Sequence, residues 1–171
     1  MLCIEFKIHE NLFINQNFLL LQDLGKLKIN DLSNSQLLTK MLKFSSMPNL
    51  EKLILRNCRS FCKIHSSIGE LKKLTLLNVN LCEKLKSFSS NIELESHEFL
   101  YLTGCQKLEK FLEIHGNMGH LKELHLDNSG IKEIPSSIEY WQLLKFFHFI
   151  DVEILTNFRI FIGDYYSKSA I

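Results

Sequence analysis

The stretch that decides the fold is residues 50–58, which read LEKLILRNC. The same pattern of leucines, ending in a small residue, returns at residues 74–82 (LTLLNVNLC) and at residues 121–129 (LKELHLDNS). Looser copies surround these three, and the second anchor of each copy falls 23 or 24 residues after the previous one. These anchors are Phe6, Asn30, Leu53, Leu77, Leu100, Leu124 and Phe147. A repeat of this period predicts a solenoid.

Apolar and polar residues alternate around each second anchor, which is typical of a short strand with one buried face. Such a strand cannot bury its apolar face alone, but stacked copies merge their leucines into one core. We therefore predict an α/β leucine-rich-repeat solenoid with a curved parallel sheet in sequence order and short helical or irregular return segments. Strands should centre near residues 30, 53, 77, 100, 124 and 147. The expected organisation is a degenerate first repeat or N-terminal flank over 1–23, about six repeats of 23–24 residues over 24–152, and a final return segment and tail over 153–171.

The small residue that ends each copy forms a column through the repeats. Cys58, Cys82 and Cys105 lie 24 and 23 residues apart, so we expect them to stack inside the edge of the sheet and to hydrogen-bond weakly to neighbouring backbone. A second recurrent segment marks the turn onto the convex side and occurs at residues 64–68 (IHSSI), 88–92 (FSSNI) and 134–138 (IPSSI).

Composition limits the classes of partner. The 171 residues are 46% hydrophobic and 23% charged with a formal net charge of +1, so no strong basic field favours nucleic acid or a membrane surface. We also expect no secretory leader and no membrane span. Five cysteines, an odd number, and the lack of an Asn-x-Ser/Thr sequon favour reduced thiols in a cytoplasmic or nuclear protein.

Catalytic and ligand-binding motifs are not evident. His115, His120 and His125 come at intervals of five, which is not a zinc spacing, and no Gly-x-Ser-x-Gly surrounds a serine. No phosphate-binding loop occurs among the seven glycines. We therefore expect no enzyme, no cofactor and no metal.

The outward side chains of the strands remain as the candidate surface, on the concave face that such solenoids commonly use for binding. Aromatic side chains among polar ones are typical of protein interfaces. The alternative is that the apolar members pack only against one another or against a further domain. The candidate protein-binding residues are Ile54, Arg56, Leu76, Asn78, Phe99, Tyr101, Glu123, His125, Asp127 and His148.

Several phrases of the sequence resemble one known family. Residues 47–53 (MPNLEKL), 84–88 (KLKSF) and 134–138 (IPSSI), with Cys or Ser in the small-residue column, are similar to the repeats of plant intracellular TIR-NBS-LRR disease resistance proteins. The resemblance covers roughly residues 24–152. It implies binding of a pathogen effector or of a guarded host protein, and restraint of a nucleotide-binding switch domain.

The chain also departs from that family. Its members carry a TIR domain and a nucleotide-binding domain ahead of the repeats, so we expect this chain to be a fragment or a truncated paralogue. Asn30 and His97 stand where the family has aliphatic residues, and we expect His97 to be half-buried. The alternative family is the Ras-group leucine-rich-repeat proteins, intracellular scaffolds for signalling proteins. Their repeats have Asn in the small-residue column and Leu-Pro in most copies, whereas here only Ile134-Pro135 matches.

Overall fold

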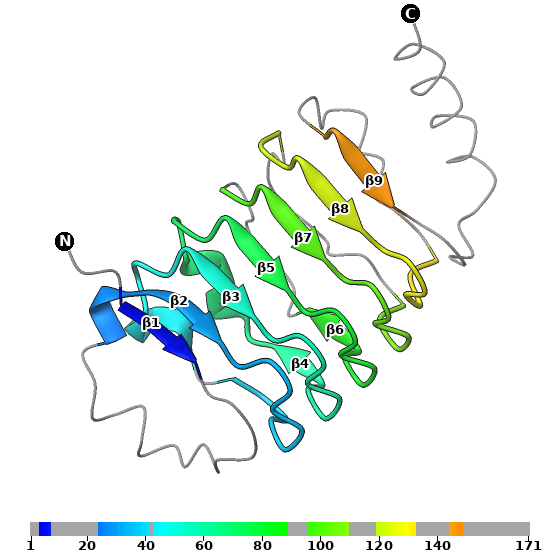
Figure 1. Ribbon diagram of the computed structural model, residues 1–171, viewed down its shortest axis with the longest axis horizontal. Coiled ribbons are helices and arrows are strands. Elements are labelled where there is room, and N and C mark those ends of the chain that lie inside the picture. The colour runs from blue at the N-terminus through cyan, green and yellow to red at the C-terminus, as the bar shows by residue number, and fades with distance from the viewer. Residues whose placement is uncertain are drawn as a thin grey trace, which may run out of the picture.

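The computed structural model describes residues 4–7, 24–41, 43–88, 96–109, 119–132 and 144–148. Over these ranges the chain winds as a solenoid whose successive coils each add one strand to the same sheet (Figure 1). The strands pair in parallel in the order β1-β2-β3-β5-β7-β8-β9, so the predicted leucine-rich-repeat solenoid is confirmed. They are β1 (Ile4–Lys7), β2 (Leu27–Asp31), β3 (Lys52–Ile54), β5 (Leu76–Asn78), β7 (Phe99–Tyr101), β8 (Glu123–His125) and β9 (Phe146–His148).

The predicted register is confirmed at every strand pair of this sheet. Each second anchor pairs with the next, from Phe6 with Asn30 at one end to Leu124 with Phe147 at the other. Beyond the strands, amides of one coil donate to carbonyls of the next, as from Leu55 to Asn78 and from Leu126 to His148, both at 2.7 Å. The backbone of each coil is therefore satisfied largely by its neighbours.

The core lies inside the coils and consists of the inward anchors together with apolar residues of the return segments. Leu53, Leu77 and Leu124 are fully buried, and Phe44 and Phe61 fill the space behind them. Each buried aliphatic side chain stabilises the fold by roughly 1.5–3 kcal/mol relative to its exposed state.

The return segments are short, as expected, because 23 or 24 residues leave little chain after the strand and its turns. They contain the 3₁₀ helices η2 (Leu24–Lys26), η3 (Phe44–Ser46) and η4 (Ser66–Glu70). The strands β4 (Lys63–Ile64) and β6 (Ser87–Phe88) form a second, two-stranded parallel sheet. Among the described residues, no helix has the length and apolar character needed to span a membrane.

The recurrent segment at residues 64–68 makes the expected change of direction, from the end of β4 into η4. The ring of His65 accepts the amide of Ser67 and so caps the start of this helix. Of the other two copies, Phe88 ends β6, while residues 89–92 and 134–138 lie outside the described residues.

The cysteine column is confirmed. All three thiols are fully buried, and each donates to a backbone carbonyl of the preceding coil. Burial raises the pKa of Cys58 to about 11 and that of Cys82 to about 12, so both are neutral thiols near pH 7. The donor and acceptor pairs are Cys58 and Leu32 (3.1 Å), Cys82 and Leu55 (3.1 Å), and Cys105 and Val79 (3.2 Å).

Ser35 and Ser129 continue the small-residue column on either side of the three cysteines. A left-handed turn, which was not predicted, precedes each of the five members. Most of the residues that adopt it are Asn or Gly, which tolerate a positive φ, but one is a leucine. The lack of a side chain at Gly104 also makes room for this leucine, since a Cβ at Gly104 would lie 2.8 Å from Cδ2 of Leu81. The five residues and their φ angles are Asn34 (65°), Asn57 (59°), Leu81 (61°), Gly104 (74°) and Asn128 (52°).

Replacing the leucine in this turn should stabilise the protein. Leu81→Asn is expected to raise the free energy of unfolding by about 0.5–1 kcal/mol, because asparagine tolerates the left-handed conformation that costs other residues about 1–2 kcal/mol. Urea denaturation measures the change. Asn57→Leu, in the equivalent turn one coil earlier, should have the opposite sign, and a loss of stability in Leu81→Asn would contradict this explanation.

Two polar residues occupy inward anchor positions. The expectation that His97 is half-buried is wrong: it is 1% exposed, because its position belongs to the same fully buried column as Leu74 and Leu121. Neither ring nitrogen of His97 has a hydrogen-bond partner among the described residues, and burial lowers its pKa from the ordinary 6.5 to about 4. Asn30 is equally buried, with its amide nitrogen 3.8 Å from the sulfur of Met47, and its amide oxygen has no partner in the part of the chain that the structure describes.

His97→Leu is expected to raise the free energy of unfolding by about 1 kcal/mol at pH 7, because it removes an unpaired polar group from the core. The gain should increase as the pH falls. With the folded pKa near 4 and the ordinary value at 6.5, the unfolded chain takes up the proton first, so the native protein loses stability between pH 6.5 and 4 while the leucine variant lacks this loss. Urea denaturation at pH 7, 5.5 and 4.5 checks both statements, and a gain that does not depend on pH would contradict the second.

Candidate functional site

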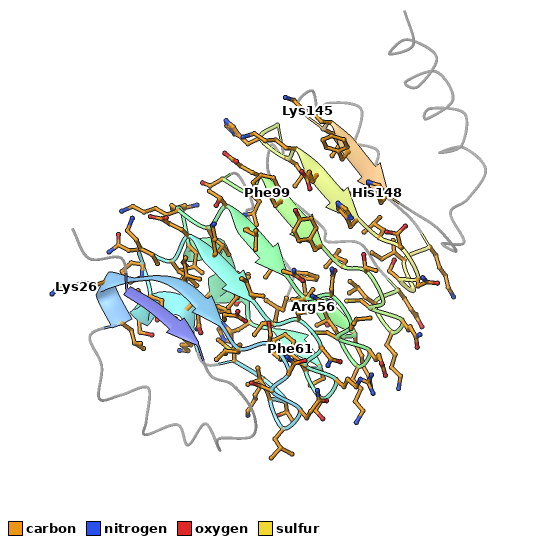
Figure 2. All side chains as sticks on the ribbon, in the orientation of Figure 1. Lys26, Arg56, Phe61, Phe99, Lys145 and His148 are labelled. Carbon is orange, nitrogen blue, oxygen red and sulfur yellow. The ribbon has the colours of Figure 1, made fainter. Side chains whose placement is uncertain are left out.

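The candidate site lies on the outward side of the main sheet, opposite the core, and we call it the strand face. Figure 2 shows Phe99 on β7 and His148 on β9, two of its members. The strand register confirms two of the columns that the repeat predicts. The first runs Ile29, Lys52, Leu76, Phe99, Glu123 and Phe146, and the second runs Asp31, Ile54, Asn78, Tyr101, His125 and His148.

Three rings form a continuous row in the second column. The ring of Tyr101 meets that of His125 edge-on, with centroids 4.8 Å apart. His125 in turn stacks on His148, with centroids 4.5 Å apart and an angle of 20° between the planes. The row therefore crosses three strands, and cross-strand pairs of this kind also stabilise the sheet.

The hydroxyl of Tyr101 donates to Oε2 of Glu123 at 2.9 Å. Burial, and then this hydrogen bond and the negative charge of Glu123, raise the pKa of Tyr101 to about 12. The same carboxylate oxygen lies 3.6 Å from Nε2 of His125. Glu123 thus connects the first column to the row of rings.

The apolar candidates of the strand face are divided between the two columns. Leu76 and Phe99 are direct cross-strand neighbours, but Asn78 separates Ile54 from Tyr101 along their column. All four apolar candidates are half-buried rather than fully exposed. The ammonium of Lys122 lies 6.0 Å from the centroid of the Phe99 ring and so covers part of it.

The candidate set omitted an apolar residue that is well exposed. Phe146 of β9 is 53% exposed and pairs with Glu123. Its position in the same column as Phe99 was the signal that could have identified it. The exposed apolar surface of the strand face therefore reaches further towards the C-terminal strand than the candidate set implied.

The remaining candidates are polar, and they differ in exposure and in hydrogen bonding. The side-chain oxygen of Asn78 accepts the amide of Asn80 at 3.0 Å and so holds the turn after β5. Arg56 and His148 are exposed, whereas Asp127 is half-buried beyond the end of β8. Arg56 and His148 thus offer charge or hydrogen bonds to solvent, while the oxygen of Asn78 is already used.

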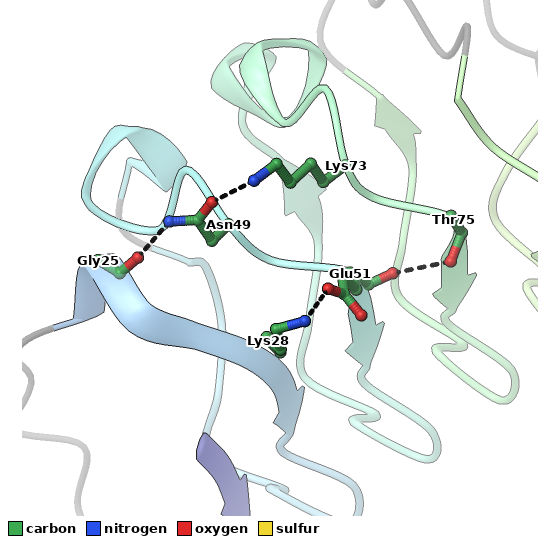
Figure 3. A network of polar contacts seen from close by, with 6 residues as sticks. All are labelled: Gly25, Lys28, Asn49, Glu51, Lys73 and Thr75. Carbon is green, nitrogen blue, oxygen red and sulfur yellow. Dashed lines mark hydrogen bonds and ion pairs between the residues drawn. The ribbon is translucent and has the colours of Figure 1, made fainter. Parts of the chain in front are cut away.

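A row of polar residues flanks the strand face at the start of the strands (Figure 3). Lys28 contacts Glu51 at 2.5 Å, and the hydroxyl of Thr75 donates to the Glu51 carbonyl at 3.2 Å. Further along the row, Lys122 contacts Glu98 at 2.8 Å. These partly exposed ion pairs link adjacent coils, each contributing about 0–1 kcal/mol.

The sequence of the chain is similar to those of known proteins. No family model matches it. It is 42% identical over 115 residues to the TMV resistance protein N of Nicotiana glutinosa, and 38% identical over 125 residues to the disease resistance protein RML1A of Arabidopsis thaliana. These alignments cover 67% and 72% of the chain but only 10% and 12% of the two relatives. The chain belongs to the plant disease resistance proteins.

Within the disease resistance proteins, the chain is a leucine-rich-repeat module, and the family resemblance of its repeat phrases is confirmed. It spans about a tenth of the length of the relatives it matches. Among solved structures, a leucine-rich-repeat protein of Leptospira interrogans is 21% identical, with a TM-score of 0.28 over 75% of this chain and 44% of that one.

In this repeat module, Glu123→Gln is expected to lower the pKa of Tyr101 from about 12 towards 10, because the carboxylate no longer opposes ionisation of the hydroxyl. A pKa raised by folding means that stability is lost as the pH rises from 10 through 12, and the variant should lose less of it. The ring carbon signals of isotopically labelled tyrosine report the titration. Glu98→Gln is the control, since Glu98 contacts Lys122 instead, and an equal effect in both variants would contradict the assignment.

Proposed function

We propose that the chain is a non-catalytic protein-recognition module of a plant immune receptor and that its strand face binds the partner. The partner is a pathogen effector or a guarded host protein, or the nucleotide-binding switch domain that the module restrains. The row formed by Tyr101, His125 and His148 is the observation that carries this proposal, because the register of three strands brings its rings side by side.

Rigid aromatic side chains bind proteins well because they bury large areas at a small cost in conformational entropy. Here Tyr101 is held by its hydrogen bond to Glu123, so little of its freedom is left to lose on binding. Phe99 and the exposed Phe146 add apolar area on either side of Glu123. An aromatic and apolar centre surrounded by polar residues is the usual arrangement of a protein–protein interface.

Charge is distributed unevenly along the strand face. Lys52 and Arg56 are exposed on and just after β3, whereas Glu123 and Asp127 lie on and just after β8. A partner with acidic groups facing β3 and basic groups facing β8 would therefore bind in one orientation. Such complementarity affects the association rate and the specificity more than the affinity.

Phe99→Ala and Tyr101→Ala are each expected to weaken partner binding by at least about 1 kcal/mol, roughly fivefold in Kd, with thermal stability nearly unchanged. Tyr101→Phe should retain most of the affinity if the ring is what binds. Calorimetry or surface capture measures Kd, with candidate effectors in one arm and the nucleotide-binding domain of a relative in the other.

Two control variants lie away from the strand face. Leu37→Ala removes an exposed apolar side chain, 63% exposed, from a return segment. Lys86→Ala removes an exposed charge next to β6. If either control weakens binding as much as Tyr101→Ala does, the strand face is not the binding surface.

A further inference from the structure

Three potential metal ligands converge at one end of the strand face. His125 of β8 pairs across the sheet with His148 of β9, and Asp127 follows His125 by two residues. One ligand atom from each of the three residues lies within 4.8 Å of the others. The three residues cannot be recognised as a metal site from their sequence spacing, because His125 and Asp127 are two residues apart while His148 follows His125 by one repeat of 23 residues.

The backbone on which these residues stand is fixed by the ladder between coils. The amide of Leu126, which lies between His125 and Asp127, donates to the His148 carbonyl at 2.7 Å. The Asp127 carbonyl accepts the amide of Gly104 at 2.8 Å. Only side-chain torsions are therefore left to adjust around a ligand.

We propose that His125, Asp127 and His148 bind a divalent transition-metal ion such as Zn²⁺. Two imidazoles and one carboxylate suit metal ions of borderline softness, such as Zn²⁺. Bonds of about 2.0–2.2 Å in tetrahedral geometry place neighbouring ligand atoms about 3.3 Å apart. From a largest separation of 4.8 Å, the atoms must approach by about 1.5 Å at most, which a rotation of the exposed His148 ring out of its stack supplies. Three protein ligands leave a fourth position open towards the partner side of the sheet.

The surroundings of His125 also favour a cation. Its Nε2 atom is buried and makes no hydrogen bond within the described part of the chain, so the ring contains an unsatisfied polar atom. The Glu123 carboxylate lies 3.6 Å from that atom and is itself held by the hydroxyl of Tyr101. When one ring nitrogen of a histidine binds a metal, a carboxylate beside the other nitrogen orients the ring and raises its basicity, so Glu123 beside Nε2 would support binding through Nδ1 of His125.

The test uses the full chain, first stripped with a chelator and then titrated with Zn²⁺ in a calorimeter. One equivalent should bind. His148→Ala and Asp127→Asn should each weaken binding by at least about tenfold, while His120→Ala, which removes an exposed histidine from the approach to β8, should not. If both site variants bind as the native chain does, or if His120→Ala weakens binding equally, the ion is held elsewhere and the proposal is wrong.

A second measurement needs no variant. In the native chain, Zn²⁺ should shift the ring ¹⁵N signals of His125 and His148 together, at one equivalent. Substitution by Co²⁺ should give a visible spectrum without thiolate charge transfer, because no cysteine belongs to the site. A thiolate band, or ring signals of these two histidines that do not move, would overturn the assignment whatever the variants show.

Discussion

The register of parallel backbone hydrogen bonds between coils is the constraint on which the rest of this structure depends. Strands such as β3 and β7 are only three residues long and cannot persist alone, so their stability comes from pairing with the coils on either side. A slip of one residue would turn the leucines outward and the polar residues into the core. The thiols of the cysteine column and the amides of the left-handed turns bond to adjacent coils in the same register, and both therefore oppose such a slip.

The same register creates the candidate site. Tyr101, His125 and His148 are distant in sequence, yet they touch because each follows the previous one by a single repeat. The core and the surface are thus specified by alternate residues of the same strands. This separation allows the outward residues to change while the inward residues keep the fold.

The main features of the fold could be predicted from the sequence, whereas the second sheet, the left-handed turns and the side-chain contacts could not. The period of 23 or 24 residues predicts the main strands, the columns of the strand face and the cysteine column, because pairing in a solenoid follows sequence order. The second sheet escapes prediction because β4 and β6 have two residues each, too few to show alternation. Asn34 and Asn57 are typical of a left-handed turn, but Leu81 is not, so the repetition of this turn could not be recognised from the sequence. Contacts such as that of Tyr101 with Glu123 depend on side-chain rotamers, which the residues of several coils select together.

A solenoid in which the coils bond in sequence order also has a modular length. Inserting or deleting one whole unit of 23 or 24 residues leaves every remaining pairing intact and moves the later coils by one strand spacing, about 4.8 Å. Unequal recombination between two such units would therefore return a foldable chain with a reordered outer surface. Leu81 and Gly104 limit this freedom, since the leucine occupies space that the next coil leaves empty, and these two units are best inherited together.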